Sequence, residues 1–352
     1  MKASTSLLRP LRDTAYGKYD VLRPLRSRAG RKPASFTRPL PVPLSIIRPS
    51  YVPVNFWSRN SDDEKLVIDD EFEDLEGWKG DSGIGESSLG IGMIPLGGVE
   101  ERTIRHVARI ASEVLRDVET LIQPGAKTTD LDRTIHGMIL ARDAYPSPLG
   151  YQGFPKSVTT SVNNVICHGI PDERSLEESD LVNVDVTIYS ALPEEEDDDD
   201  TIPVWMHGDT SRTFALPAID TLGKELIECT REALEVGIRK CGPGLPFSEI
   251  GTAIEAFATK HGFSVNRQFT GHGIGERFHT APWIVHHKND LPGLMQPGHC
   301  FTIEPCLVQG DQSRGYGWID GWTYATESNA RSAQFEHQLL VTENGVDVLT
   351  RI

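Results

Sequence analysis

The chain has 352 residues, of which 38% are hydrophobic, and a formal net charge of −16 at pH 7. This length and hydrophobic content are enough for one large or two modest packed domains, which excludes a wholly disordered protein. No stretch has the apolar length of a membrane span. The five cysteines occur in no paired spacing, so the sequence favours free buried thiols in a reducing compartment over a disulfide framework.

Residues 1–59 are basic and rich in proline. They hold 12 Lys and Arg against 2 Asp and Glu, a net charge of +10, so the rest of the chain carries −26. Such an Arg-rich, acid-poor segment is unlike a packed fold and is typical of a disordered organellar transit peptide. We therefore expect a mitochondrial protein, with a plastid or the cytoplasm as alternatives. The other interpretation is a basic tail that contacts nucleic acid or the ribosome, although no nucleic-acid-binding motif occurs.

Residues 60–97 are acidic and then glycine-rich, as expected of a linker. A helical apolar pattern begins at Val99, and a second helix is expected from about Thr129. Two more helices are expected over Leu222–Arg239 and Phe247–His261. Strands are expected where apolar and polar residues alternate. The acidic residues that are considered below as site residues lie in or beside these strands.

The sequence contains an internal repeat. Residues that follow Pro124 align with those that follow Pro243, an offset of 119 positions. The same offset carries Asp185 onto Glu304. Two duplicated halves would place these two carboxylates on equivalent strands, so we expect a site on the pseudo-twofold axis between the halves.

Four acidic residues lie in the alternating runs. Asp185 is in Leu181–Tyr189, which we expect to be a half-buried strand with Asp185 on its polar face, and Asp209 follows His207 and Gly208. Glu304 and Glu336 occupy the polar positions of two late runs, Phe301–Val308 and Gln334–Val341. Acidic residues are poor strand formers, so each needs a local reason to be there.

A shared sheet face would bring these carboxylates together. Two such charges about 4 Å apart repel by about 4 kcal/mol at an effective dielectric constant of 20. Four converging acids therefore call for cations, and two divalent ions would balance them. His272, which lies in a glycine-rich turn, would add one nitrogen ligand, a set that suits Mn, Fe, Co or Zn better than Ca or Mg. Such a centre activates water.

The strings NVDVT, HGDTS, GHGIG, FTIEP and QFEHQLLVTENG carry these residues in a fixed order. In that order the chain resembles the type I methionine aminopeptidases over residues 98–352, and the stretch from Tyr145 to Asp172 is similar to their organellar branch. The resemblance implies an α+β pita-bread fold, with pseudo-twofold duplicated halves and helices covering one side of an antiparallel sheet. It also implies a monomer that removes the initiator methionine from nascent polypeptides when the second residue is small.

The resemblance also implies residue roles. Asp185, Asp209, His272, Glu304 and Glu336 would hold two metal ions, and Glu304 would be the general base. His168 and His279 would hydrogen-bond the substrate amide and the developing oxyanion. The methionine pocket would be lined by Tyr151, Phe154, Thr159, Phe278 and Trp322. His286 and His287 are adjacent but are expected to be structural, because neighbouring strand residues point to opposite faces.

Three other classes of protein fit the sequence less well than a type I methionine aminopeptidase. A pita-bread peptidase that cuts before proline would carry a folded N-terminal domain, which the composition of residues 1–97 does not indicate. A type II methionine aminopeptidase would need a subdomain between Glu304 and Glu336, where 31 residues leave no room. A non-catalytic binding protein on the same fold would have lost metal ligands.

The seven consecutive acids of residues 194–200 depart from the family pattern, and we expect a solvated hairpin extension or a ribosome-docking segment there.

Overall fold

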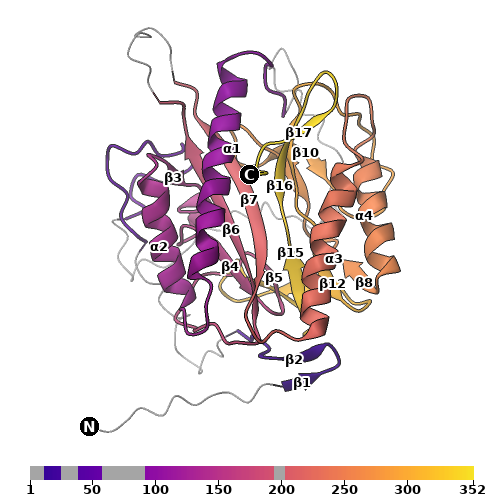
Figure 1. The fold of residues 1–352 in the computed structure, drawn as a ribbon. Coiled ribbons are helices and arrows are strands. Elements are labelled where there is room, and N and C mark those ends of the chain that lie inside the picture. Colours follow the sequence, from indigo (N-terminus) through magenta and orange to yellow (C-terminus); the bar gives the residue numbers. More distant parts are fainter. Residues whose placement is uncertain (1–11, 25–38, 58–91, 194–202) are drawn as a thin grey trace, which may run out of the picture.

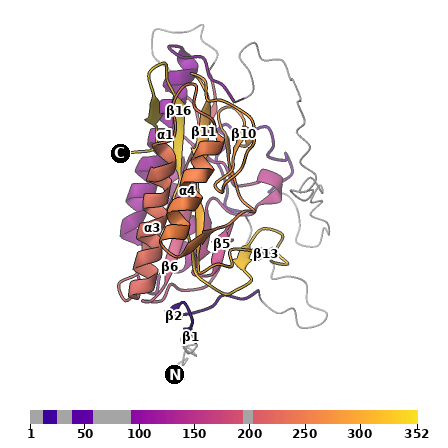
Figure 2. The same cartoon turned by 90° about the vertical axis from the view of Figure 1, so that its right-hand side faces the viewer.

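The computed structural model describes residues 12–24, 39–57, 92–193 and 203–352. Its core is an α+β arrangement in which the long helices lie on one side of antiparallel sheets (Figure 1). The view turned by a quarter shows this layering directly, with the helices along one edge and the strands and loops behind them (Figure 2). Within the described ranges, no helix is long and apolar enough to cross a membrane.

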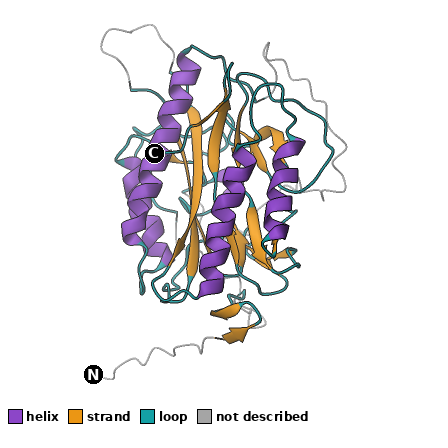
Figure 3. Cartoon of the chain, turned by 45° about the vertical axis from the view of Figure 1, so that its right-hand side comes forward, coloured by secondary structure: helices purple, strands orange, loops and turns teal. Residues whose placement is uncertain are grey.

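The four long helices come in two pairs. They are α1 (Val99–Val118), α2 (Thr128–Leu140), α3 (Thr221–Ile238) and α4 (Ser248–Lys260), with short 3-10 turns η2 (Glu119–Leu121) and η3 (Tyr151–Gly153). Helix α1 buries its apolar stripe on β6 and β7, and α3 packs on α4 and on the strands of the C-terminal half. Figure 3 shows the helices lying over the strands. Asp220 caps α3 by accepting a 2.8 Å hydrogen bond from the Gly223 amide, as an N-cap aspartate does.

The strands form several small antiparallel sheets. The N-terminal half contains β3 (Tyr145–Pro146), β4 (Thr159–Val162), β5 (Val165–Cys167), β6 (Leu181–Ser190) and β7 (Met206–Ala215). The C-terminal half contains β8 (Phe263–Val265), β9 (Gly271–Gly273), β10 (Thr280–Ile284), β11 (Cys300–Ile303), β12 (Cys306–Gln309), β13 (Gly315–Gly317), β14 (Tyr324–Thr326), β15 (Ser332–Gln334), β16 (His337–Val341) and β17 (Val346–Val348). A backbone hydrogen bond of 3.0 Å from Glu336 to Ser211 joins the two halves at the centre.

The duplication predicted from the sequence is visible in the backbone. The α1–α2 pair precedes the β6–β7 hairpin, as the α3–α4 pair precedes β11 and β16. Each half also has an isolated bridge just before its second helix, Lys127 with Ser175 and Pro246 with Leu294. Both members of the first bridge map onto the second with the same offset of 119, so the halves share a fold as well as a sequence pattern.

Three expectations need correction. The polar face of β6 is not open to solvent, because Asn183 and Thr187 are both buried under the second half of the molecule. The two late strands are each interrupted. Pro305 separates β11 from β12, and the pair Phe335–Glu336 separates β15 from β16, so each break falls at a candidate ligand.

The basic N-terminal segment also differs from the prediction. Residues 12–24 contain the hairpin β1 (Arg12–Thr14) and β2 (Gly17–Tyr19), and the guanidinium of the buried Arg331 donates to the Tyr16 carbonyl oxygen at 2.9 Å. Residues 39–57 bury apolar side chains against the folded domain. The expectation that residues 1–59 have no packed structure is therefore wrong for these two ranges. Most of the predicted linker, residues 60–91, and the acidic insertion 194–200 lie outside the described residues.

The five cysteines agree with the prediction of unpaired thiols. All are free, and four are buried, Cys241 being half-buried. They act as small core residues; Cys229 and Cys300, for example, belong to the apolar clusters behind the sheets.

Candidate metal centre

Four acidic side chains and one histidine converge where the two halves meet. In the β6–β7 hairpin, Thr187 pairs with Asp209 and Asp185 pairs with Ser211, so the two aspartates are diagonal neighbours. Glu304 directly follows β11 and Glu336 directly precedes β16, at the same end of one ladder. His272 is the middle residue of β9, which pairs with β11. Each half thus supplies two carboxylates, and the second half adds the histidine.

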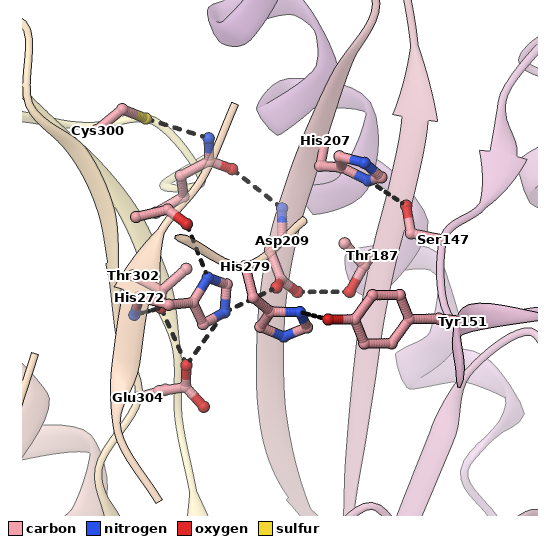
Figure 4. Close-up of polar contacts among 12 residues, drawn as sticks. Ser147, Tyr151, Thr187, His207, Asp209, His272, His279, Cys300, Thr302 and Glu304 are labelled. Carbon is pink, nitrogen blue, oxygen red and sulfur yellow. Dashed lines mark hydrogen bonds and ion pairs between the residues drawn. The ribbon is translucent and has the colours of Figure 1, made fainter. Parts of the chain in front are cut away.

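The distances within this cluster are short (Figure 4). His272 Nε2 lies 3.7 Å from Asp209 Oδ2 and 3.5 Å from Glu304 Oε1. Asp209, His272 and Glu336 each offer one ligand atom, and these atoms all lie within 4.8 Å of one another. Asp185 is near enough to Asp209 and Glu304 for their charges to act on it. The structure therefore brings all five predicted residues together.

Burial makes the carboxylates costly to ionise. It raises the pKa of Asp209 to about 7. Burial also raises the pKa values of Asp185, Glu304 and Glu336 well above their ordinary range, and their mutual repulsion adds to the effect. For His272 the same burial lowers the pKa to about 4, which leaves a neutral ring nitrogen free to coordinate. Without a positive charge among them, these acids destabilise one another.

The chemistry of the donor set fits divalent cations. Four carboxylates carry the charge of two such ions, and one neutral imidazole adds the borderline ligand that favours Mn, Fe, Co or Zn. The Oδ1 atom of Asp185 is buried and has no hydrogen-bond partner among the described residues. A buried carboxylate oxygen without a donor is expensive unless it is paired or coordinates a metal. That oxygen is the single observation that best fits a cation held at this site.

Polar neighbours hold the acids in place. The Thr187 hydroxyl donates to Asp209 Oδ1 at 2.7 Å (Figure 4). The Thr302 hydroxyl and the Gln334 amide donate to the two oxygens of Glu304 at 2.9 and 3.1 Å. We did not predict any of these three residues. The sequence does contain a signal for them, because each lies two positions from a candidate ligand and so on the same face of its strand.

His286 also supports the cluster. It is buried, and its Nε2 accepts a 3.1 Å hydrogen bond from the Glu304 amide. Burial lowers its pKa to about 3, so the ring stays neutral and can accept. His287 is half-buried, and its Nδ1 lies 3.1 Å from the Lys288 carbonyl oxygen. His286 thus fixes the backbone of Glu304, one of the candidate ligands.

His168 and His279 lie beside the cluster. The rings of His279 and His272 are 4.2 Å apart between centroids, and His279 Nδ1 is 3.0 Å from the Tyr151 hydroxyl oxygen (Figure 4). His168 has φ of 56° and lies edge-on to Phe269, 5.3 Å away. Burial lowers the pKa of His168 to about 4 and also lowers the pKa of His279. Both rings are therefore neutral near pH 7 and able to hydrogen-bond a substrate.

The predicted pocket residues form two groups at this site. Tyr151 contacts Phe278, with ring centroids 5.0 Å apart. Phe154 contacts Trp322 in an edge-on arrangement at 5.1 Å. Thr159 pairs across the β4–β6 ladder with Asp185 itself. Aromatic rings beside a polar cluster suit an apolar side chain whose backbone reaches the acids.

Comparisons with known proteins identify the family of this chain. The sequence model of metallopeptidase family M24 matches residues 102–191 and 200–343. The chain is 45% identical over 242 residues to methionine aminopeptidase 1D, chloroplastic/mitochondrial, of Arabidopsis thaliana, with 69% of this chain and 65% of that protein covered. It is 44% identical over 250 residues to the mitochondrial 1D enzyme of Dictyostelium discoideum, with 70% and 59% covered. The match thus spans somewhat under two thirds of these relatives' length.

Solved structures give the same fold. The methionine aminopeptidase of Rickettsia prowazekii superposes with a TM-score of 0.64 at 38% identity, over 70% of this chain and 95% of that one. The enzyme of Thermotoga maritima gives a TM-score of 0.67 at 29% identity, over 74% and 100%. The prolidase of Pyrococcus furiosus, at 18% identity and a TM-score of 0.54 over 72% and 64%, shares only the fold. The pita-bread architecture predicted from the sequence is thereby confirmed, and the chain belongs to metallopeptidase family M24.

Proposed function

We propose that this protein is a methionine aminopeptidase that hydrolyses the first peptide bond of newly made polypeptides when the second residue is small. The observation that carries the proposal is the buried cluster of four carboxylates and one neutral histidine, with the partnerless oxygen of Asp185. It is supported by relatives that are named methionine aminopeptidases at 42–47% identity.

In this proposal Asp185, Asp209, His272, Glu304 and Glu336 hold two divalent ions. Bound there, the ions would supply an activated water and polarise the scissile carbonyl. The protein groups do the rest. The two oxygens of Glu304 are held by Thr302 and Gln334, so this carboxylate of the cluster is placed to take up and return a proton.

The two accessory histidines act on the substrate. Since both rings are neutral, each carries one N–H that can donate to an amide or to an oxygen gaining negative charge. The ring nitrogen of His279 that faces Tyr151 is engaged by that hydroxyl, which leaves its other nitrogen for the substrate. Tyr151, Phe154, Thr159, Phe278 and Trp322 would receive the methionine side chain, because aromatic rings attract sulfur.

The direct test uses the full chain loaded separately with Mn, Co, Fe or Zn. We expect free methionine from Met-Ala-Ser and little from Met-Lys-Ser, and no release by the His272→Ala variant. Ala-Pro-Ala is included as a substrate for a proline-directed peptidase. Cleavage of that peptide alone would replace the proposal with the prolidase-like alternative. No turnover by protein that binds stoichiometric metal would point to the binding-protein alternative.

We further propose that the basic N-terminal segment directs the protein to a mitochondrion or plastid, where it acts as a monomer on nascent chains near the ribosome. The support is its composition and relatives named as organellar forms. Because residues 12–24 and 39–57 pack on the folded domain, we propose that both ranges stay with the working enzyme. N-terminal sequencing of the protein from isolated organelles tests this, and a mature start beyond residue 12 would contradict it.

A further inference from the structure

Residues 39–57, here called the N-terminal strap, form a closed unit. The Trp57 indole nitrogen donates to the Leu40 carbonyl oxygen at 2.9 Å, which ties the two ends of the strap together. Arg48 donates to the Val42 carbonyl oxygen at 3.1 Å, and its guanidinium lies 4.1 Å above the Trp57 ring. The strap therefore has a defined shape of its own, although it is short and rich in proline.

The strap is seated on the catalytic domain by apolar contacts. Its buried members pack in one cluster with two residues of the domain, the cluster being Val42, Ile46, Val52, Phe56, Tyr145 and Leu149. At one edge, His136 Nε2 lies 3.0 Å from the Pro41 carbonyl oxygen. Since the cluster includes the residues just before Tyr151, the strap lies against the segment that leads into the candidate substrate pocket.

Tyr51 is the strap residue that faces the pocket side chains. Its hydroxyl donates to the Ser147 carbonyl oxygen at 2.7 Å. Its ring lies edge-on to Tyr151, with centroids 5.0 Å apart and an interplanar angle of 84°. The same ring is nearly parallel to that of His207, at 6.0 Å and 19°. A single side chain thus contacts two aromatic residues of the domain and is fixed by its own hydrogen bond.

Those two residues lead to the substrate-facing side chains. The Tyr151 hydroxyl lies 3.0 Å from His279 Nδ1 (Figure 4). His207 stacks on Phe278, with ring centroids 5.2 Å apart and an interplanar angle of 13°. Phe278 and His279 stack on each other at 4.1 Å. One series of contacts therefore runs from Tyr51 through Tyr151 to His279. A second series runs from Tyr51 through His207 to Phe278, and both end beside His272.

We propose that Tyr51 is a positioning residue, which holds Tyr151 and His207 and through them sets the orientation of His279 and Phe278 toward the substrate. This inference rests on the proposed aminopeptidase function. Displacing a reacting or hydrogen-bonding group by about 1 Å can cost about 100-fold in rate, even when the change is remote. The N-terminal strap would then be part of the active site rather than a leader to it.

A merely structural role makes a different prediction. If the strap only adds stability, any substitution that loosens it lowers the melting temperature and leaves kcat unchanged. If Tyr51 acts through Tyr151, removing the Tyr51 ring lowers kcat, and this effect is smaller in a protein whose Tyr151 is already altered. A double-mutant cycle separates these cases.

The test compares full-length, metal-loaded variants on Met-Ala-Ser. We expect Tyr51→Leu to lower kcat by about tenfold with a smaller change in KM. Tyr51→Phe keeps the ring and should retain most of the activity. In the double variant Tyr51→Leu/Tyr151→Phe, the factor by which kcat falls should be clearly smaller than the product of the factors measured for the two single variants. Val42→Ala, which opens the strap core, should lower the melting temperature and keep kcat, and Val54→Ala on the exposed side should change neither.

Two results would overturn the inference. One is a multiplicative effect in the double variant, and the other is a loss of kcat in Val42→Ala as large as that in Tyr51→Leu. Imidazole ¹⁵N NMR gives a readout that does not depend on turnover, because the His279 signal should move in Tyr51→Leu and stay in Val54→Ala. If the wild-type protein released no methionine, the proposed function would fail, whereas the His279 signal would still decide the role of Tyr51.

Discussion

Glu304 and Glu336 lie opposite each other at the end of one antiparallel ladder. The ladder pairs Ile303 with His337, and the same register extended by one position sets the two glutamates face to face. Both β11 and β16 have their strand ends at this point. The site therefore lies where both strands end, and the side chains that follow or precede them can turn toward a common centre.

Replacing one of these facing acids should remove metal binding with little change in shape. We expect Glu336→Gln to lower the metal content and to reduce kcat/KM by about 100-fold or more, because bound metal contributes several kcal/mol to such reactions. Metal analysis by mass spectrometry and the Met-Ala-Ser assay check both effects. Glu343→Gln, an exposed acid near the end of the same strand, is the matched control. Full metal content in Glu336→Gln would count against its role as a ligand.

The hydroxyl of Thr302 should tune metal affinity. It donates to Glu304 Oε1 at 2.9 Å and accepts from the His272 amide at 3.0 Å, so it orients two candidate ligands at once. We expect Thr302→Val to weaken metal binding by about 10- to 100-fold, as is usual for groups that orient ligands. A chelator competition titration measures this. Thr326→Val also removes a buried hydroxyl, but one that donates to the Ala330 carbonyl oxygen and not to a candidate ligand, so it should leave affinity unchanged.

The metal-free protein should become less stable as the pH rises from 7 to 8. Burial raises the pKa of Asp209 from 3.8 to about 7, and the pKa values of Asp185, Glu304 and Glu336 are raised as well. The folded state then binds more protons than the unfolded state, so the free energy of unfolding falls as these protons leave. The slope is at most about 1.4 kcal/mol per pH unit for each such proton.

The buried histidines oppose this trend only weakly. Their pKa values are lowered on folding, so they are largely neutral in both states above pH 7. Urea denaturation of chelator-treated protein at pH 7 and pH 8 measures the slope. Added Mn or Co should abolish it, because the ions compensate the carboxylate charges. A metal-free protein that gained stability over this interval would contradict the assignment.

His279 should act on the substrate and not on metal binding. Removing one donor to a developing oxyanion typically costs about 100- to 1000-fold in kcat. We expect His279→Ala to show a loss in that range with its metal content unchanged. His261→Ala, an exposed histidine at the end of α4, is the control. A loss of bound metal in His279→Ala would instead make His279 a ligand.

Much of this arrangement could be predicted from the sequence. The strand position of Asp185 followed from alternation, and the offset of 119 related Glu304 to Asp185. In the structure β11 ends at Ile303, so Glu304 directly follows the strand rather than lying in it. Alternation specifies which residues share a face, but it does not say whether that face meets water or another part of the chain. For that reason β6 was expected to be half-buried, whereas the second half of the molecule covers it.

The packing of the N-terminal strap could not be predicted in the same way. Proline-rich sequence forms few backbone hydrogen bonds, and composition rules interpret it as disorder. The strap is nevertheless ordered by tertiary contacts, from Trp57 to Leu40 within it and from Tyr51 to Ser147 outside it. No local pattern reports such contacts, because they depend on a surface built from distant residues.

The pseudo-twofold arrangement has a consequence for folding. Asp185 and Asp209 belong to one half and Glu304 and Glu336 to the other, and the contacts between them span more than 90 residues of chain. A cation shared by the two pairs would act as a crosslink between the two halves, which form the two lobes of the molecule. Such a crosslink forms only after both lobes exist, so metal uptake would be the last step of maturation, and chelation would loosen the seam between the lobes before either lobe unfolds.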